Sequence, residues 1–232
     1  GHPGARDGMT ALSYADIAGR FAKAASMHFD TIVVPAGAEA AVVRRAGGKS
    51  RCIAVPAGAA SAAALPEFTP HSTVLIVGLC GALDVKRSVG DVVVYDSVDG
   101  LRLDAQLCAD VQRAVGPTAV RVRATSVERV VCTASAKAAL GVTAHAAVVD
   151  MESRALLNAL RAQDVRVAIV RIVSDGAHND LPEIGGAYDD AGRLRPFALT
   201  FAFLRAPLRS IRFLLGLRIA LTALSRTAAA LS

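Results

Sequence analysis

The sequence predicts an α/β protein of three layers, in which helices cover both faces of a central mixed but largely parallel sheet. Two observations lead to this prediction. Short apolar runs rich in Val and Ile alternate along the chain with Ala-rich stretches, as in proteins built from repeated strand–helix units. The 232 residues show no internal repeat and no dividing linker, so a single well-buried domain accommodates them.

The alternation also gives the approximate position of each element. The expected strands are short apolar runs in which β-branched residues predominate, and they lie near residues 31–35, 51–56, 73–79, 89–95, 120–124, 146–151 and 166–173. The expected helices are the longer Ala-rich stretches between them, near residues 37–46, 58–65, 104–115, 133–141 and 152–163. Strands and helices that follow one another in this way favour parallel pairing.

Polar groups gather at the ends of two of these strands. Residues 148–153 (VVDMES) join an apolar run to acidic and hydroxyl groups, and residues 170–176 (VRIVSDG) do the same about one helix later. Open α/β sheets bind ligands at the carboxyl ends of their strands. Both segments resemble the nucleoside phosphorylase and nucleosidase superfamily, where one strand ends in Met-Glu beneath the ribose and a neighbouring strand ends in Ser-Asp beside the purine. The resemblance implies a nucleoside phosphorylase-like fold and cleavage of an N-glycosidic bond.

That reaction suits these residue types. Breaking the bond between ribose and purine builds positive charge on the sugar and negative charge on the base. Asp175, assisted by Ser174, would protonate or hydrogen-bond the base at N7. Glu152 would bind the ribose hydroxyls, and Met151 would line the sugar. Each residue also has a structural alternative: Asp175 as a helix N-cap, Glu152 as a first-turn carboxylate and Met151 as a core residue.

Two glycines extend the resemblance. Residues 75–83 and 89–94 resemble the superfamily's strand, Gly-rich turn and following Gly-Asp-Val-Val strand. Gly78 and Gly81 in this turn would permit positive φ angles and a close approach of the backbone to the substrate. Their spacing does not fit a dinucleotide-binding fingerprint. Val131 completes the set of substrate-binding residues that the resemblance implies.

Residues 32–42 resemble the first strand and turn of the nucleosidases, whose glutamate orients or activates the attacking water. The resemblance therefore gives this catalytic role to Glu39. The alternative is an exposed glutamate at a helix start. The sequence leaves hydrolysis and phosphorolysis both open, and Arg44, Arg45 or Lys49 would supply the cations for phosphate as a co-substrate.

No cofactor and no metal is expected. The four cysteines, Cys52, Cys80, Cys108 and Cys132, have neither CxxC nor metal-ligand spacing and suit reduced thiols in a cytosolic protein. The histidines show neither HxxxH nor HExxH spacing. His178 either borders the base pocket or is a solvated loop residue.

The two ends of the chain differ from the catalytic domain, which we place at residues 30–190. Residues 1–29 form an N-terminal extension, in which residues 1–8 resemble an expression remnant or a disordered arm and charges interrupt any signal-peptide core. Residues 191–232 form a basic amphipathic tail, expected to pack on the same domain. After Asp190 there are seven arginines and no acidic residue, so the formal net charge of +6 arises in this tail.

The tail permits two interpretations. Arginines and leucines at helical spacing suit peripheral contact with an anionic membrane surface. Alternatively, a terminal helix packs on the core or on a second subunit with its arginines solvated. The charges argue against a spanning segment. Nucleic acid is not an expected partner, because aliphatic residues rather than stacking aromatics lie between the arginines.

The tail and residues 78–83 (GLCGAL) most resemble the hopanoid-associated nucleosidase or phosphorylase. That resemblance implies release of adenine from adenosylhopane, an adenosine whose ribose C5′ carries a triterpenoid lipid. It places a homodimer in the cytoplasm, at the inner face of the cytoplasmic membrane. The alternatives are a methylthioadenosine, adenosylhomocysteine or futalosine nucleosidase and, in another class, a non-catalytic nucleoside-binding protein of the membrane surface.

Overall fold

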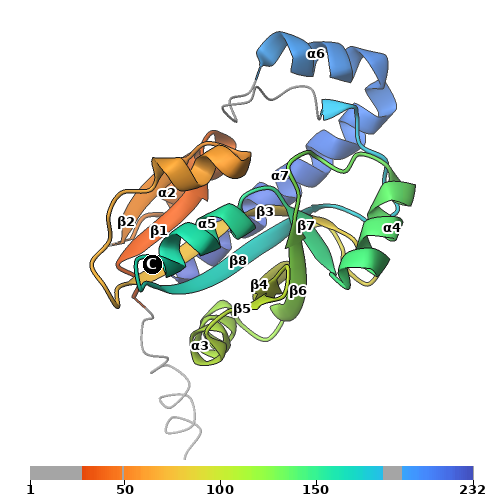
Figure 1. Cartoon of the computed structure of the whole chain (residues 1–232). Coiled ribbons are helices and arrows are strands. Elements are labelled where there is room, and N and C mark those ends of the chain that lie inside the picture. Colours follow the sequence, from red (N-terminus) through yellow and green to blue (C-terminus); the bar gives the residue numbers. More distant parts are fainter. Residues whose placement is uncertain (1–27, 49, 185–194, 232) are drawn as a thin grey trace, which may run out of the picture.

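The computed structural model describes residues 28–48, 50–184 and 195–231, and it shows a central mixed sheet surrounded by helices (Figure 1). The predicted fold class is confirmed. The predictions made for residues 1–27, for Lys49 and for residues 185–194 lie outside the described residues.

The sheet consists of β1 (Thr31–Pro35), β2 (Arg51–Val55), β3 (Thr73–Ala82), β4 (Val92–Val98), β5 (Leu101–Arg102), β6 (Val120–Ser126), β7 (Val148–Asp150) and β8 (Arg166–Asp175). The pairs β1–β2, β1–β3, β3–β8, β4–β6 and β6–β7 are parallel. The pairs β3–β7, β4–β5 and β4–β8 are antiparallel. The sheet is therefore mixed but largely parallel, as the alternation of strands and helices predicts.

Five of these strands close into a ring. Strand β8 pairs with both β3 and β4, and β3 is also joined to β4 through β7 and β6. At the closure, Gly81 of β3 pairs with Val149 of β7 and with Asp175 of β8. The ring thus brings together the two strand ends that carry the polar motifs.

The helices are α2 (Ala38–Ala46), α3 (Ala105–Val115), α4 (Ala134–Ala144), α5 (Ser153–Arg161), α6 (Pro196–Arg205) and α7 (Pro207–Ala230), with a 3₁₀ helix η1 (Gly58–Ala64). In Figure 1, α5 lies in front of the sheet and α7 passes behind β8. Helix α5 buries Leu156, Leu157 and Leu160, which share one face of the helix. Helix α7 packs against α2, β3 and β8.

Helix α7 has two distinct halves. Its second half contributes Ala220, Leu224 and Ala228 to the main core, whereas Leu208 and Ile211 in the first half are exposed. Within the described part of the chain, α7 is the one helix long and apolar enough to cross a membrane by length and composition. Because its second half is packed in the core, α7 belongs to the same domain as the sheet.

The structure corrects the expected turn at residues 78–81. Strand β3 continues to Ala82, so Gly78 and Gly81 are strand residues, and neither has a positive φ angle. Near the site, positive φ angles occur instead at Gly37, which immediately precedes α2, and at Gly58, the first residue of η1. The stretch near residues 58–65 forms the 3₁₀ helix η1, and the strand expected from residue 89 begins at Val92.

Candidate active site

A cavity of about 760 Å³ lies where β1, β2, β3, β7 and β8 end. One end of its wall is polar, with the side chains of Glu39, Lys137, Glu152, Ser174 and Asp175. The other end is apolar and is made largely by the C-terminal helices and the segment before them, through Leu181, Ile184, Leu199, Phe203, Phe213, Leu214 and Leu217. The cavity therefore joins a group of charged side chains to an extended apolar compartment.

The predicted site residues gather around this cavity. Those that line it are Glu39, Gly81, Val131, Met151, Glu152, Ser174 and Asp175. Gly78 does not line it and lies in β3 beneath the polar end. The other candidates lie elsewhere: His178 is exposed and outside the wall, as are Arg44 and Arg45 at the end of α2.

Glu39 enters the cavity from the first turn of α2, which follows β1. Its carboxylate accepts a hydrogen bond of 2.7 Å from the backbone N–H of Leu79. Loss of solvent raises the pKa of Glu39 to about 7, and the neighbouring Glu152 acts in the same direction while Arg171 opposes it. Glu39 is therefore poised to gain or lose a proton near neutral pH, as a general base requires.

Glu152 occupies the N-cap position of α5 without capping the helix through its side chain. Its carboxylate instead accepts a hydrogen bond of 3.1 Å from the N–H of Gly58 and lies 3.3 Å from Arg171 Nη2. Burial raises its pKa, and Arg171 counteracts that rise. Glu152 thus lies at the start of α5, as its structural alternative expects, but its side chain contacts a segment far away in the sequence.

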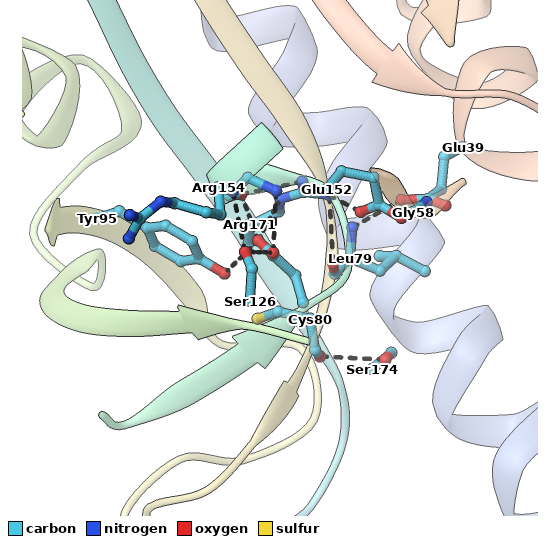
Figure 2. A network of polar contacts seen from close by, with 12 residues as sticks. Glu39, Gly58, Leu79, Cys80, Tyr95, Ser126, Glu152, Arg154, Arg171 and Ser174 are labelled. Carbon is cyan, nitrogen blue, oxygen red and sulfur yellow. Dashed lines mark hydrogen bonds and ion pairs between the residues drawn. The ribbon is translucent and has the colours of Figure 1, made fainter. Parts of the chain in front are cut away.

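Arg171 links two acidic groups of the site, Asp150 and Glu152. Sequence analysis did not single it out. Its side chain is fully buried in the middle of β8, with Nε 3.3 Å from Asp150 Oδ2 and Nη2 3.3 Å from Glu152 Oε2. Figure 2 shows its guanidinium lying between Tyr95 and Glu152. A buried arginine with two carboxylate partners fixes both of them, because separating the charges in a dry interior is costly.

Asp150 anchors the other side of this network. It accepts hydrogen bonds from Tyr95 Oη at 3.1 Å, from Ser126 Oγ at 2.6 Å and from the N–H of Ser153 at 3.1 Å. The Ser153 hydroxyl also donates to it. These donors hold the Asp150 carboxylate in place beside Arg171.

Asp175 is the last residue of β8 and is held from two sides. Ser174 Oγ lies 2.8 Å from Asp175 Oδ1 and 3.1 Å from the carbonyl oxygen of Cys80. The ammonium of Lys137, from α4, forms an ion pair with Asp175 Oδ2 and is itself completely buried. Lys137 is the second site residue that sequence analysis missed.

The two glycines of β3 make room for these side chains. A Cβ on Gly81 would lie 3.0 Å from Asp175 Oδ2, and one on Gly78 would collide with Arg171 and approach Glu39 Oε1 to 2.8 Å. The absence of a Cβ at Gly78 and Gly81 thus admits the side chains of Arg171, Glu39 and Asp175, while the close approach of this backbone to a substrate stays a prediction.

The fold is similar to that of several solved structures. A methylthioadenosine/adenosylhomocysteine nucleosidase from Neisseria meningitidis, in complex with methylthio-immucillin-A, is 17% identical, with a TM-score of 0.60 over 88% of this chain and 98% of that one. The chain has the nucleosidase fold. The corresponding nucleosidase from Streptococcus pneumoniae, in complex with 8-aminoadenine, matches at 16% identity and a TM-score of 0.56, over 84% of this chain and 100% of that one. Futalosine hydrolase of Helicobacter pylori shares the nucleosidase fold at 13% identity, with a TM-score of 0.55 over 83% of this chain and 97% of that one. No family model and no curated protein matches the sequence.

Proposed function

We propose that the protein cleaves the N-glycosidic bond of an adenine nucleoside and releases adenine. One observation carries this proposal: Glu39, Glu152 and Asp175 come from three separate elements and converge on one cavity at the strand ends. A buried, preorganised set of carboxylates suits a reaction in which charge separates between sugar and base. The nucleosidase fold supports the same class of reaction.

The side chains divide the chemistry as follows. Glu152 accepts hydrogen bonds from the ribose hydroxyls above Met151. As the bond from C1′ to N9 breaks, its electron pair moves onto the purine, and Asp175, its carboxyl group oriented by Ser174, delivers to N7 a proton taken up from solvent. Glu39 takes a proton from the water whose oxygen bonds to C1′. The raised pKa of Glu39, about 7, fits that last step.

Hydrolysis is the route that we propose. Glu39 and Glu152 lie at the sugar end of the cavity, where an inorganic phosphate would have to bind next to two carboxylates. Repulsion between like charges disfavours that arrangement, whereas a neutral water molecule is not repelled.

The substrate that we propose is adenosylhopane. The support comes from the apolar compartment, in which Phe203 and Phe213 form a tilted aromatic pair on α6 and α7. A nucleoside whose ribose C5′ bears a large hydrocarbon would bury that group there, at about 25 cal/mol for each Å² removed from water. We place the reaction in the cytoplasm and expect a homodimer, which light scattering of the purified protein would test.

A substrate panel tests the proposed function. The purified full chain is incubated with adenosylhopane, methylthioadenosine, adenosylhomocysteine and futalosine, in isotopically labelled water with and without phosphate, and the products are identified by mass spectrometry. We expect adenine and a ribosyl lipid that carries the label at C1′ and forms without phosphate. The solved nucleosidases favour the smaller substrates as the alternative, so faster turnover of a thionucleoside would assign the protein to that group. Purine binding without turnover of any nucleoside would indicate the non-catalytic alternative.

A further inference from the structure

An apolar stripe runs along the outside of the two C-terminal helices. Phe197 is 92% exposed, Leu204 75% and Leu208 74%. These residues belong to a series that is spaced by three or four positions within each helix, so that it follows one side of α6 and one side of the first half of α7. We call this series the outer face, and it consists of Phe197, Phe201, Leu204, Leu208, Ile211, Leu215 and Ile219.

A line of arginines follows the same helices beside the outer face. Arg205, Arg209 and Arg212 recur at helical spacing, and all three are exposed. Arg205 stacks over the ring of Phe201, with 4.2 Å between its Cζ and the ring centroid. No acidic residue follows Asp190, so α6 and α7 themselves carry only basic charges, although Arg209 Nη2 is paired with Asp180 Oδ2 of a preceding segment at 3.0 Å. An apolar stripe bordered by arginines is the pattern of helices that lie in the interface of a bilayer.

We propose that the outer face docks on the surface of an anionic lipid bilayer. The arginines would meet the headgroups while the apolar side chains enter the region between headgroups and acyl chains. Pairing of this face with a second copy is disfavoured, because a two-fold contact places the same basic patch on both subunits and so brings two surfaces of like charge together. The charge of the outer face therefore favours an anionic bilayer over a second copy as its partner.

The inner side of the same helices lines the cavity. Leu199 and Phe203 of α6, with Phe213 of α7, line the cavity, while Phe201, Leu204, Leu208 and Ile211, which alternate with them in the sequence, belong to the outer face. Docking would therefore place the compartment one helix thickness, about 10 Å, from the lipid. This proposal is independent of the proposed function, since a bilayer can bind the protein whether or not it cleaves a nucleoside.

Vesicle flotation tests the proposal with the full-length protein and no substrate. Vesicles of phosphatidylcholine are compared with vesicles that also contain phosphatidylglycerol, at low and at high salt. We expect binding to the anionic vesicles that weakens as salt rises. Arg212→Gln should lower the partition coefficient about fivefold, the equivalent of about 1 kcal/mol for one arginine near the surface. The pair Leu208→Ser with Ile211→Ser should lower it further.

Matched controls separate docking from folding and from self-association. Val85→Ser with Val142→Ser removes exposed valines elsewhere on the molecule, at 61% and 75% exposure, and should leave vesicle binding unchanged. Point substitutions are needed because deleting the tail would also remove Ala220 and Leu224 from the core. The proposal is overturned if the full chain ignores anionic vesicles, if the valine control weakens binding as much as the leucine–isoleucine pair does, or if that pair dissociates a dimer while vesicle binding is unaffected.

Discussion

The ammonium of Lys137 on α4 is buried against the carboxylate of Asp175 at the end of β8, 38 residues further along the chain. The same nitrogen donates to the carbonyl oxygens of Gly176 at 3.0 Å and Asn179 at 3.1 Å. All three of its N–H groups are thus used, and they fix both the carboxylate and the loop that follows it. The position of the Asp175 carboxylate at the end of β8 is thus set by a residue of α4.

Replacing Lys137 should therefore affect stability and catalysis together. Lys137→Met leaves Asp175 without its buried partner, and we expect a loss of about 3 kcal/mol in the free energy of unfolding, measured by urea denaturation. Adenine release should fall at least tenfold. The double variant Lys137→Met with Asp175→Asn removes both charges and should recover part of the lost stability. If the two single losses simply add, the ion pair does not couple these residues.

Glu39→Gln should abolish hydrolysis. The glutamine can still accept the hydrogen bond from Leu79, so the fold is retained while the base is lost, and we expect adenine release to fall at least about 100-fold. Glu67→Gln, an exposed substitution outside the cavity wall, is the control and should have the wild-type rate. Retention of activity by Glu39→Gln would remove Glu39 from the mechanism.

The raised pKa of Glu39 predicts opposite pH effects on rate and on stability. For the wild type, kcat/KM should rise with a midpoint near pH 7, because the base acts in its ionised form. Stability should fall as pH rises from about 4.5 to 7, since over that range the folded state holds a proton that the unfolded state has released. Glu39→Gln should be more stable than the wild type at pH 8 by about 1–2 kcal/mol and should lose that advantage at pH 4.5. Urea denaturation at the two pH values measures the difference.

Arg171 should be essential to the fold, whereas another arginine of the same strand should not. Arg171→Met leaves Asp150 and Glu152 buried without their cation, and we expect a loss of about 3–5 kcal/mol. Arg166→Gln removes a solvent-exposed pair with Asp104 and should cost less than about 1 kcal/mol. Similar melting temperatures for the two variants would contradict the role of Arg171 as the link between the acidic groups.

Gly216→Ala should destabilise the protein although it lies within a helix. Alanine usually stabilises a helix by about 1 kcal/mol relative to glycine. At this position, however, a Cβ would lie 2.7 Å from the backbone carbonyl oxygen of Ser174, and we expect a net loss of about 1–3 kcal/mol. Thr222→Ala, exposed on the same helix, is the control and should be neutral or slightly stabilising. Thermal unfolding of both variants tests how closely α7 packs against the end of β8.

The sequence predicts the site residues that belong to local sequence patterns. Met151, Glu152, Ser174 and Asp175 each directly follow or end an apolar strand, and strand ends face the ligand in α/β sheets. The order of β8 between β3 and β4, by contrast, depends on pairing between distant segments, which no local pattern specifies. For the same reason the closed ring was not predicted.

Sequence analysis missed Arg171 and Lys137, although each has a weak indication in the sequence. Arg171 is a lone charge in the middle of the run VAIVRIV, and a charge buried at that position requires an acidic partner. Lys137 is the one charged residue in the Ala-rich helix ASAKAALGVTA, where it reads as a solvated side chain until its partner on β8 is known. The expected turn at Gly78 and Gly81 rests on the resemblance to a Gly-rich turn, and the role of these glycines in admitting bulky neighbours appears only in three dimensions.

Helix α7 also sets the order in which the nascent chain can fold. It follows every strand in the sequence, yet Ala220 and Leu224 cover the apolar face of the sheet. While the ribosome is still translating the preceding elements, that face has no cover and is open to chaperones or to aggregation. The strands can therefore pair before α7 emerges, but the cavity gains its walls from Phe213 and Leu217 only afterwards. The apolar wall of the cavity is therefore the last part of it that synthesis of the chain can supply.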